Sequence, residues 1–83
     1  MCADWAGSGI QVNAIAPGYF VTELTQPLRD DEQFDAWITR RTPAGRWGQV
    51  NEPAGTAVFL ASAASDFVNG QIIDVDGGVL AVL

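Results

Sequence analysis

Residues 10–16 form a short apolar run, IQVNAIA, that stops at Pro17-Gly18. Alternate positions of an extended chain point to opposite faces, so one face would carry Ile10, Val12, Ala14 and Ala16 and the other Gln11, Asn13 and Ile15. Its β-branched residues and its glycine and proline boundaries favour a β-strand. The near-continuous apolar character of the run is typical of a strand in a parallel sheet covered on both sides.

A second strand is predicted at residues 71–76, QIIDVD, where Gly77-Gly78 ends it. The connection is predicted to hold a loop over residues 19–26 and two helices. One helix spans residues 27–41, with Asp30 or Asp31 as its cap and Thr42-Pro43 as its end. The other runs from Asn51, as N-cap, to about Ala63; it is apolar nearly all round and is expected to be buried on more than one side.

Two strands joined by a long helical connection are expected to be parallel neighbours with a right-handed crossover. The predicted fold class is therefore α/β, a partial Rossmann-like doubly wound fold with two parallel strands and crossover helices. Residues 1–6, MCADWA, are predicted to be the last turns of a helix that Gly7-Ser8-Gly9 ends. Because so short a helix is marginal alone, we expect Met1 to lie partway through an element of a longer parent.

The chain has 83 residues, enough for at most one small domain with a modest core. Cys2 is the single cysteine and there is no histidine, so the sequence offers no internal disulfide, no Cys-rich metal site and no histidine base. Oligomerisation or a larger parent protein is the expected source of the missing burial.

The formal net charge is −6, with four arginines and no lysine. Without a basic stripe the chain is predicted to bind neither nucleic acid nor an anionic membrane surface. No apolar run reaches the length of a membrane span, and no positively charged segment precedes an apolar core near the N-terminus. We therefore expect a cytoplasmic location.

The end of the first predicted strand is a candidate ligand site, because ligands of open parallel sheets bind outside the carboxyl ends of the strands. Pro17 fixes the direction of the turn, and Gly18 lets the backbone approach a ligand closely. Thr22 offers a hydroxyl for an amide or a phosphate. The alternative, which the pattern alone favours, is a simple Pro-Gly turn with Thr22 as a cap of the loop.

The segments PGYF, GRWG, EPAG, FLAS, SDFVNGQ and VDGG follow one another in this order between Trp5 and Gly78. In this order they resemble the C-terminal part of a short-chain dehydrogenase/reductase, and within that family the gluconate 5-dehydrogenase-like branch of sugar-acid and polyol dehydrogenases. The resemblance covers nearly the whole chain. It implies that residues 1–83 are a C-terminal fragment of a Rossmann-fold dehydrogenase domain.

The resemblance also implies a nicotinamide cofactor, NAD or NADP. Pro17, Gly18 and Phe20 match loop positions that hold its nicotinamide end, Phe20 through its backbone. Thr22 matches a threonine that contacts the nicotinamide amide or the pyrophosphate. Asn13 matches an asparagine with a structural role.

Residues 19–46 match the variable flap over the substrate. Two aromatic residues of this flap either pack or close over a ligand: Phe34 and Trp37. Its arginines either meet a substrate carboxylate or stay solvated: Arg40, Arg41 and Arg46. The last strand matches one that commonly packs at a subunit interface, with Asp74, Asp76, Gly77 and Gly78.

Two motifs of the family have no counterpart in this sequence. No glycine-rich cofactor turn follows a strand, since Gly7 and Gly9 precede one. The catalytic Tyr-x-x-x-Lys is also missing, since the chain has no lysine and Tyr19 is its only tyrosine. That chemistry needs a phenol whose pKa a neighbouring cation lowers. We therefore assign no catalytic residue, and expect neither turnover nor tight cofactor binding by the chain alone.

Three hypotheses follow from these features. The chain is the C-terminal segment of an NAD(P)-dependent oxidoreductase for an alcohol or carbonyl such as a sugar acid or polyol, inactive alone. Alternatively, it is a non-catalytic module that self-associates through an exposed strand edge and an apolar helix, as a homo-oligomer. In the third hypothesis it pairs with a missing, separately encoded N-terminal part.

Overall fold

The computed structural model describes residues 1–82. The helices are α1 Cys2–Trp5, α2 Gln26–Asp30, α3 Glu32–Arg41 and α4 Ala54–Leu60. The strands are β1 Ala14–Pro17 and β2 Ile72–Val75. Short 3-10 turns lie at Ala6–Ser8, Ala63–Ser65 and Leu80–Val82.

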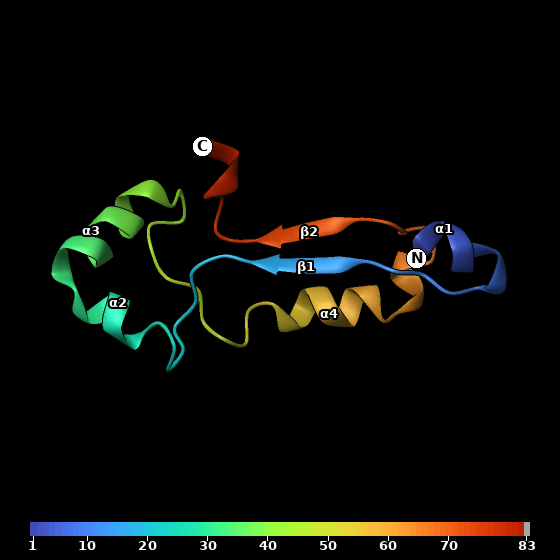
Figure 1. The fold of residues 1–83 in the computed structure, drawn as a ribbon, viewed down its shortest axis with the longest axis horizontal. Coiled ribbons are helices and arrows are strands. Elements are labelled where there is room, and N and C mark those ends of the chain that lie inside the picture. The colour runs from blue at the N-terminus through green and yellow to red at the C-terminus, as the bar shows by residue number, and fades with distance from the viewer. Residues whose placement is uncertain (83) are drawn as a thin grey trace.

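β1 and β2 form a two-stranded parallel sheet, with Ala14 opposite Ile72 and Pro17 opposite Val75. α4 runs beside the strands, whereas α2 and α3 lie beyond the ends to which both strands point (Figure 1). The predicted α/β class, with two parallel strands and crossover helices, is confirmed. This arrangement places the segment 19–48 at the carboxyl ends of the strands, where parallel sheets bind ligands.

The first strand is shorter than predicted, because β1 begins at Ala14 and not at Ile10. Side chains make part of the pairing in the preceding residues: the Val12 carbonyl still accepts from the Gly70 N–H at 2.9 Å, but the N–H of Val12 donates to Asn69 Oδ1 at 2.9 Å. Asn13 Nδ2 donates to the Val68 carbonyl at 3.0 Å, and Asn13 Oδ1 accepts from the N–H of Gln71, just before β2, at 3.0 Å. The structural role expected for Asn13 is thus a bridge between the two strand entries.

The predicted helix over residues 27–41 is in fact two helices that meet at Asp31. Asp31 has extended dihedral angles, φ −82° and ψ 104°, and its carboxylate accepts from the N–H groups of Gln33 and Phe34. This is an N-cap, one of the two capping residues predicted, and it starts α3 after a break. α3 ends at Arg41, as the following Thr42-Pro43 predicts.

The predicted helix from Asn51 to Ala63 is also too long. Residues 51–53 form a turn, Pro53 precedes α4, and Asn51 is not the N-cap. At the other end Ser62 is extended, with φ −109° and ψ 167°, and its hydroxyl accepts from the N–H of Ala64. α4 has no buried residue, so the burial expected on more than one side is absent from this chain's described residues.

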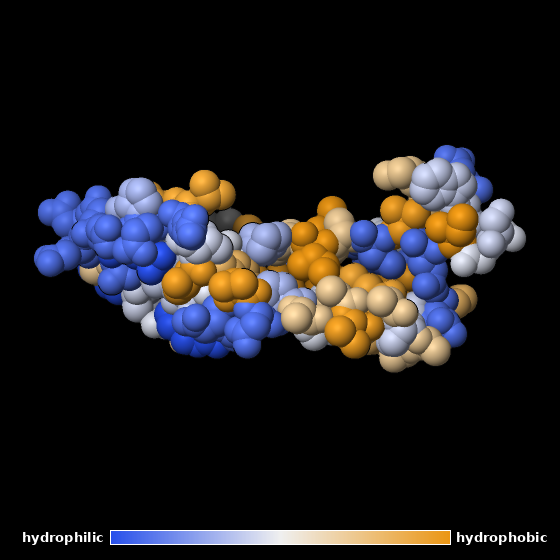
Figure 2. All heavy atoms as spheres, turned by 90° about the horizontal axis from the view of Figure 1, so that it is seen from below, coloured by the Kyte–Doolittle hydropathy of each residue, from blue (hydrophilic) through white to orange (hydrophobic). Residues whose placement is uncertain are grey.

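The core is small. Ile38 and Trp47 are the buried hydrophobic residues of the described chain. The radius of gyration is 15.7 Å, against about 12 Å for a compact domain of this length. Apolar side chains gather over the middle of the face that α4 occupies (Figure 2). Several apolar side chains of the chain are largely exposed, among them Val58 on α4 at 68% and Ile72 on β2 at 70%.

Candidate cofactor and substrate site at the carboxyl ends of the strands

The end of β1 lies against the end of β2. The N–H of Gly18 donates to the Val75 carbonyl at 3.0 Å, which continues the ladder past Pro17. A Cβ atom on Gly18 would lie 2.5 Å from the Asp76 Cβ and 2.8 Å from its Cα. Glycine is therefore needed for the approach of the second strand. The sequence suggested a close approach to a ligand, whereas the contact that this chain displays is with its own backbone.

The loop after β1 is fastened to the segment that follows α3. Phe20 forms a bridge with Gly48, in which Gly48 N–H donates to the Tyr19 carbonyl at 2.9 Å and Val21 N–H donates to the Gly48 carbonyl at 2.8 Å. The Phe20 ring covers Gly48, where a Cβ would lie 2.5 Å from a ring carbon. The backbone of this loop is therefore fixed by two hydrogen bonds to Gly48 and by the packing of the Phe20 ring on Gly48.

Thr22 takes part in a small hydroxyl network at the start of α2. The N–H of Thr25 donates to Thr22 Oγ1 at 3.3 Å, and the N–H of Thr22 donates to Thr25 Oγ1 at 3.0 Å. Arg29 Nη2 donates to the Thr22 carbonyl at 2.8 Å. The capping role that the sequence left open is the one seen here. Thr25 and Arg29 were not singled out, although the Thr-x-x-Thr spacing was a visible signal.

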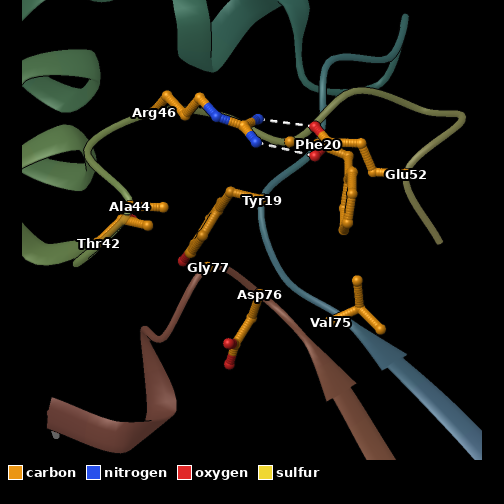
Figure 3. Close-up of a pocket in the computed structure, with 10 residues that line it drawn as sticks. Tyr19, Phe20, Thr42, Ala44, Arg46, Glu52, Val75, Asp76 and Gly77 are labelled. Atoms are coloured by element: carbon orange, nitrogen blue, oxygen red, sulfur yellow. Dashed lines mark hydrogen bonds and ion pairs between the residues drawn. The ribbon is translucent and has the colours of Figure 1, made fainter. Parts of the chain in front are cut away.

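A groove with a volume of about 460 Å³ opens beside the strand ends. Its lining comes from three segments: Ala16, Pro17, Gly18 and Tyr19 around the end of β1, Trp37, Ile38 and Arg41 on α3, and Asp74, Asp76, Val79 and Leu80 around the end of β2. A smaller pocket of about 70 Å³ shares Tyr19 and Asp76 with this groove and has Phe20 in its wall (Figure 3). Of the four predicted cofactor residues, Pro17 and Gly18 line the groove and Phe20 lines the smaller pocket. Thr22 lines neither of these two cavities.

Arg46 and Glu52 form a bidentate ion pair at the rim of the smaller pocket (Figure 3). The Arg46 Nη1 and Nη2 atoms lie 2.7 and 2.8 Å from the two Glu52 carboxylate oxygens. Hydrogen bonds from Arg46 and then from the Gln49 N–H lower the pKa of Glu52 to about 2. The hydrogen bond to Glu52 and the charge of its carboxylate in turn raise the pKa of Arg46. Arg46 is thus already occupied by a carboxylate of its own chain.

The aromatic residues of the flap pack mainly against one another. Phe34 lies 6.0 Å from Tyr19, 5.7 Å from Trp37 and 6.3 Å from Trp47, measured between ring centroids. Trp47 Nε1 donates to Asp35 Oδ1 at 2.6 Å, which satisfies the buried indole. Packing is therefore the role seen for Phe34. Trp37 is also part of the groove wall and is 43% exposed.

Asp76 closes the turn that follows β2. Its Oδ1 accepts from the N–H of Gly78 at 2.8 Å, and its Oδ2 accepts from the N–H of Leu80 at 3.2 Å. Gly77 and Gly78 have φ values of 67° and 98°, which favour glycine. The turn at residues 75–78, VDGG, therefore positions the part of the groove wall that contains Asp76, Val79 and Leu80.

Residues 1–80 match the family model described as enoyl-(acyl carrier protein) reductase. The chain belongs to this family of short-chain dehydrogenases/reductases. The family that the sequence resembles is thus confirmed. No helix in the described part of the chain has the length and apolar character needed to cross a membrane.

Relatives of this short-chain dehydrogenase/reductase chain carry gluconate-type names, which supports the predicted branch. It is 58% identical over 83 residues to gluconate 5-dehydrogenase of Gluconobacter oxydans, matching 100% of this chain and 32% of the relative. It is 64% identical over 78 residues to 2-dehydro-3-deoxy-D-gluconate 5-dehydrogenase of Bacillus subtilis, matching 94% and 31%. The chain therefore spans about a third of the length of these curated relatives.

Solved structures of the family superpose on the whole chain. A gluconate 5-dehydrogenase from Burkholderia cenocepacia, in complex with NADP and tartrate, has a TM-score of 0.96 and 64% identity, over 100% of this chain and 32% of that one. A putative gluconate dehydrogenase from Agrobacterium tumefaciens has a TM-score of 0.97 and 61% identity, over 100% and 33%. The short-chain dehydrogenase chain thus adopts the conformation of the matching third of these proteins.

Proposed function

We propose that the chain is the C-terminal segment of a cytoplasmic, NAD(P)-dependent short-chain oxidoreductase that acts on a sugar acid of the gluconate type. The observation that carries the proposal is the groove at the carboxyl ends of β1 and β2. Its position is the one at which parallel α/β sheets bind ligands. The names of the relatives, and the NADP and tartrate in the Burkholderia cenocepacia structure, supply the substrate and cofactor class.

The residues predicted to hold the cofactor fit a nicotinamide amide. Among residues 1–82 the N–H of Phe20 has no hydrogen-bond partner, although its carbonyl accepts from Thr25 Oγ1 at 2.7 Å. A free backbone donor in a fixed loop suits an amide oxygen. Pro17 and Gly18 supply the groove wall, and the Thr22 hydroxyl lies exposed at the end of the same loop. Hydride exchange with the substrate carbon is the chemistry that NAD(P) supplies when bound.

The chain alone is expected to be inactive. Tyr19 is its only tyrosine and lysine is absent, so the chain has no phenol with an adjacent lysine ammonium for proton transfer to the substrate. Tyr19 instead packs edge-on against Trp47, with ring centroids 5.8 Å apart. We therefore assign to this segment the substrate and nicotinamide side of a site whose acid/base group lies elsewhere.

A chimera tests this function. Residues 1–83 replace the matching third of the Gluconobacter oxydans enzyme, and oxidation of gluconate is followed by NAD(P)H absorbance. We expect turnover by the chimera and none by the 83-residue chain. A folded chimera without gluconate-dependent turnover would overturn the proposed activity, and turnover by the chain alone would overturn its assignment as an incomplete segment.

The second candidate function is a non-catalytic, self-associating module, and the exposed surface favours an association of some kind. The chain exposes 5834 Å², against about 4,800 Å² for a compact protein of its mass. The excess is on the order of 1,000 Å², similar to the area of about 800 Å² that one partner buries in a stable complex. Either a second copy or the N-terminal part of the domain would cover it. Light scattering decides between them: a homo-oligomer favours the module, and a monomer at micromolar concentration excludes it.

A further inference from the structure

Arg41 is the cation of the groove. Its side chain lines the cavity together with Pro17 and Trp37, and its guanidinium carbon lies 5.6 Å from the centroid of the Trp37 ring. It is half-buried, whereas its neighbour Arg40 is exposed and lies outside the groove lining. The structure thus separates two adjacent arginines that the sequence could not tell apart.

The remaining arginines are engaged within the chain. Arg46 is paired with Glu52. Arg29 Nη2 donates to the Thr22 carbonyl and to Gln26 Oε1. No ion pair or hydrogen bond joins the Arg41 guanidinium to another residue in the described part of the chain.

Such a guanidinium suits a carboxylate. Its planar fork of N–H groups matches the two carboxylate oxygens, and a cation–π contact with an aromatic ring attracts the guanidinium without using an N–H hydrogen bond. Trp37 supplies that ring. Partial burial beside the ring strengthens the charge interaction relative to bulk water.

We propose that Arg41 binds the carboxylate of the sugar-acid substrate, with Trp37 as the surface that orients the guanidinium. The proposal rests on the proposed function and names the residue that makes it specific for acids. Asp74 and Asp76 lie in the same groove. They repel an anion and accept hydrogen bonds from hydroxyl groups, so the groove offers one place for a carboxylate and acceptors for the hydroxyls of a polyhydroxy chain.

The kinetic test uses the chimera with Arg41→Met and Arg41→Lys, and Arg40→Met as the matched control. Gluconate is compared with D-glucitol, a neutral polyol of the same carbon number. Loss of a hydrogen bond to a charged group predicts a rise in the gluconate KM of roughly tenfold to hundredfold for Arg41→Met. Arg41→Lys is expected to recover part of this loss. The cofactor KM, the kinetics with glucitol and the Arg40→Met variant stay unchanged.

A gluconate KM that Arg41→Met leaves at the Arg40→Met value overturns the role of Arg41 while the proposed function stands. If the chimera shows no turnover, the proposed function fails, and Arg41 is tested by binding to the 83-residue chain. Arginine side-chain NMR signals are then followed during titration with gluconate and tartrate. A saturable shift that Arg41→Met abolishes and Arg40→Met retains supports the proposal. No shift, or the same titration in both variants, refutes it.

Discussion

Gly18 tests whether the site is set by packing between the strand ends. Its φ is not in the left-handed region, so alanine is accepted by the backbone and the effect of the substitution is steric. The added Cβ of Gly18→Ala would lie 2.5 Å from the Asp76 Cβ and 2.8 Å from its Cα. Both atoms belong to Asp76, which directly follows β2, and they lie in or next to the backbone. Neither is the tip of a flexible side chain that could move away.

Overpacking of this kind costs about 1–3 kcal/mol. Since 1 kcal/mol moves the melting temperature of a protein of 150–250 residues by roughly 2–4 °C, Gly18→Ala is expected to lower the Tm of the chimera by about 2–12 °C. Gly18→Val is expected to lower it further. The assay is thermal unfolding followed by circular dichroism without cofactor, so that ligand binding does not contribute.

Gly55→Ala is the matched control. Gly55 lies in α4, and a Cβ there meets no atom of residues 1–82 within 4 Å. Alanine is favoured over glycine in a helix by about 1 kcal/mol, so the Tm is expected to stay equal or to rise. If Gly18→Ala melts with the parent and Gly55→Ala does too, the close approach of the strand ends does not determine stability and the reasoning is refuted.

Three further substitutions test the contacts around the site. Arg46→Met is expected to return the pKa of Glu52 from about 2 towards 4.5, measured by NMR titration. Because the folded pKa is lowered, the stabilisation from the Arg46–Glu52 pair is complete above about pH 4.5 and disappears as the pH falls towards 2. An unchanged pKa would contradict the pairing. Asp35→Ala leaves the buried Trp47 N–H without an acceptor and is expected to lower the free energy of unfolding by about 1–3 kcal/mol, whereas Asp35→Asn lowers it less. Urea unfolding of the chimera measures both variants, and equal losses would count against this hydrogen bond. Asn13→Ala removes two hydrogen bonds to the segment before β2 and is expected to lower the free energy of unfolding by about 1–3 kcal/mol in the same assay. The backbone amide of Gln71 is expected to exchange its hydrogen faster, and an unchanged exchange rate would exclude the bridge.

Much of the local architecture could be predicted from the sequence. The parallel pairing of two strands followed from their separation by a helical connection, and Asp30 and Asp31 were both recognisable as candidate caps, of which Asp31 is the N-cap of α3. The boundaries were less predictable. The run at residues 10–13 contains the β-branched Ile10 and Val12, but the side chains of Asn13 and of the distant Asn69 make several of the hydrogen bonds that a strand ladder would make.

The roles of the charged residues depended on distances that no spacing reveals. Arg40, Arg41 and Arg46 were equal candidates in the sequence. The fold pairs Arg46 with Glu52, six residues away across a turn, and leaves Arg41 on the groove wall. α4 likewise reads as a buried helix because it is apolar, and only the arrangement of the chain shows that its outer face has no cover within residues 1–82.

The sequence by itself indicated the family through a resemblance carried by ordered motifs such as PGYF, GRWG and VDGG. It also determined the parallel α/β class and the position of a loop at a strand's carboxyl end, because these follow from local patterns of apolar residues, glycine and proline. The tertiary structure decided why Gly18 is a glycine, which arginine lines the groove, and how much apolar surface stays exposed among residues 1–82. Those properties depend on atoms brought together from distant parts of the chain, such as Gly18 and Asp76, and local patterns carry no information about such contacts.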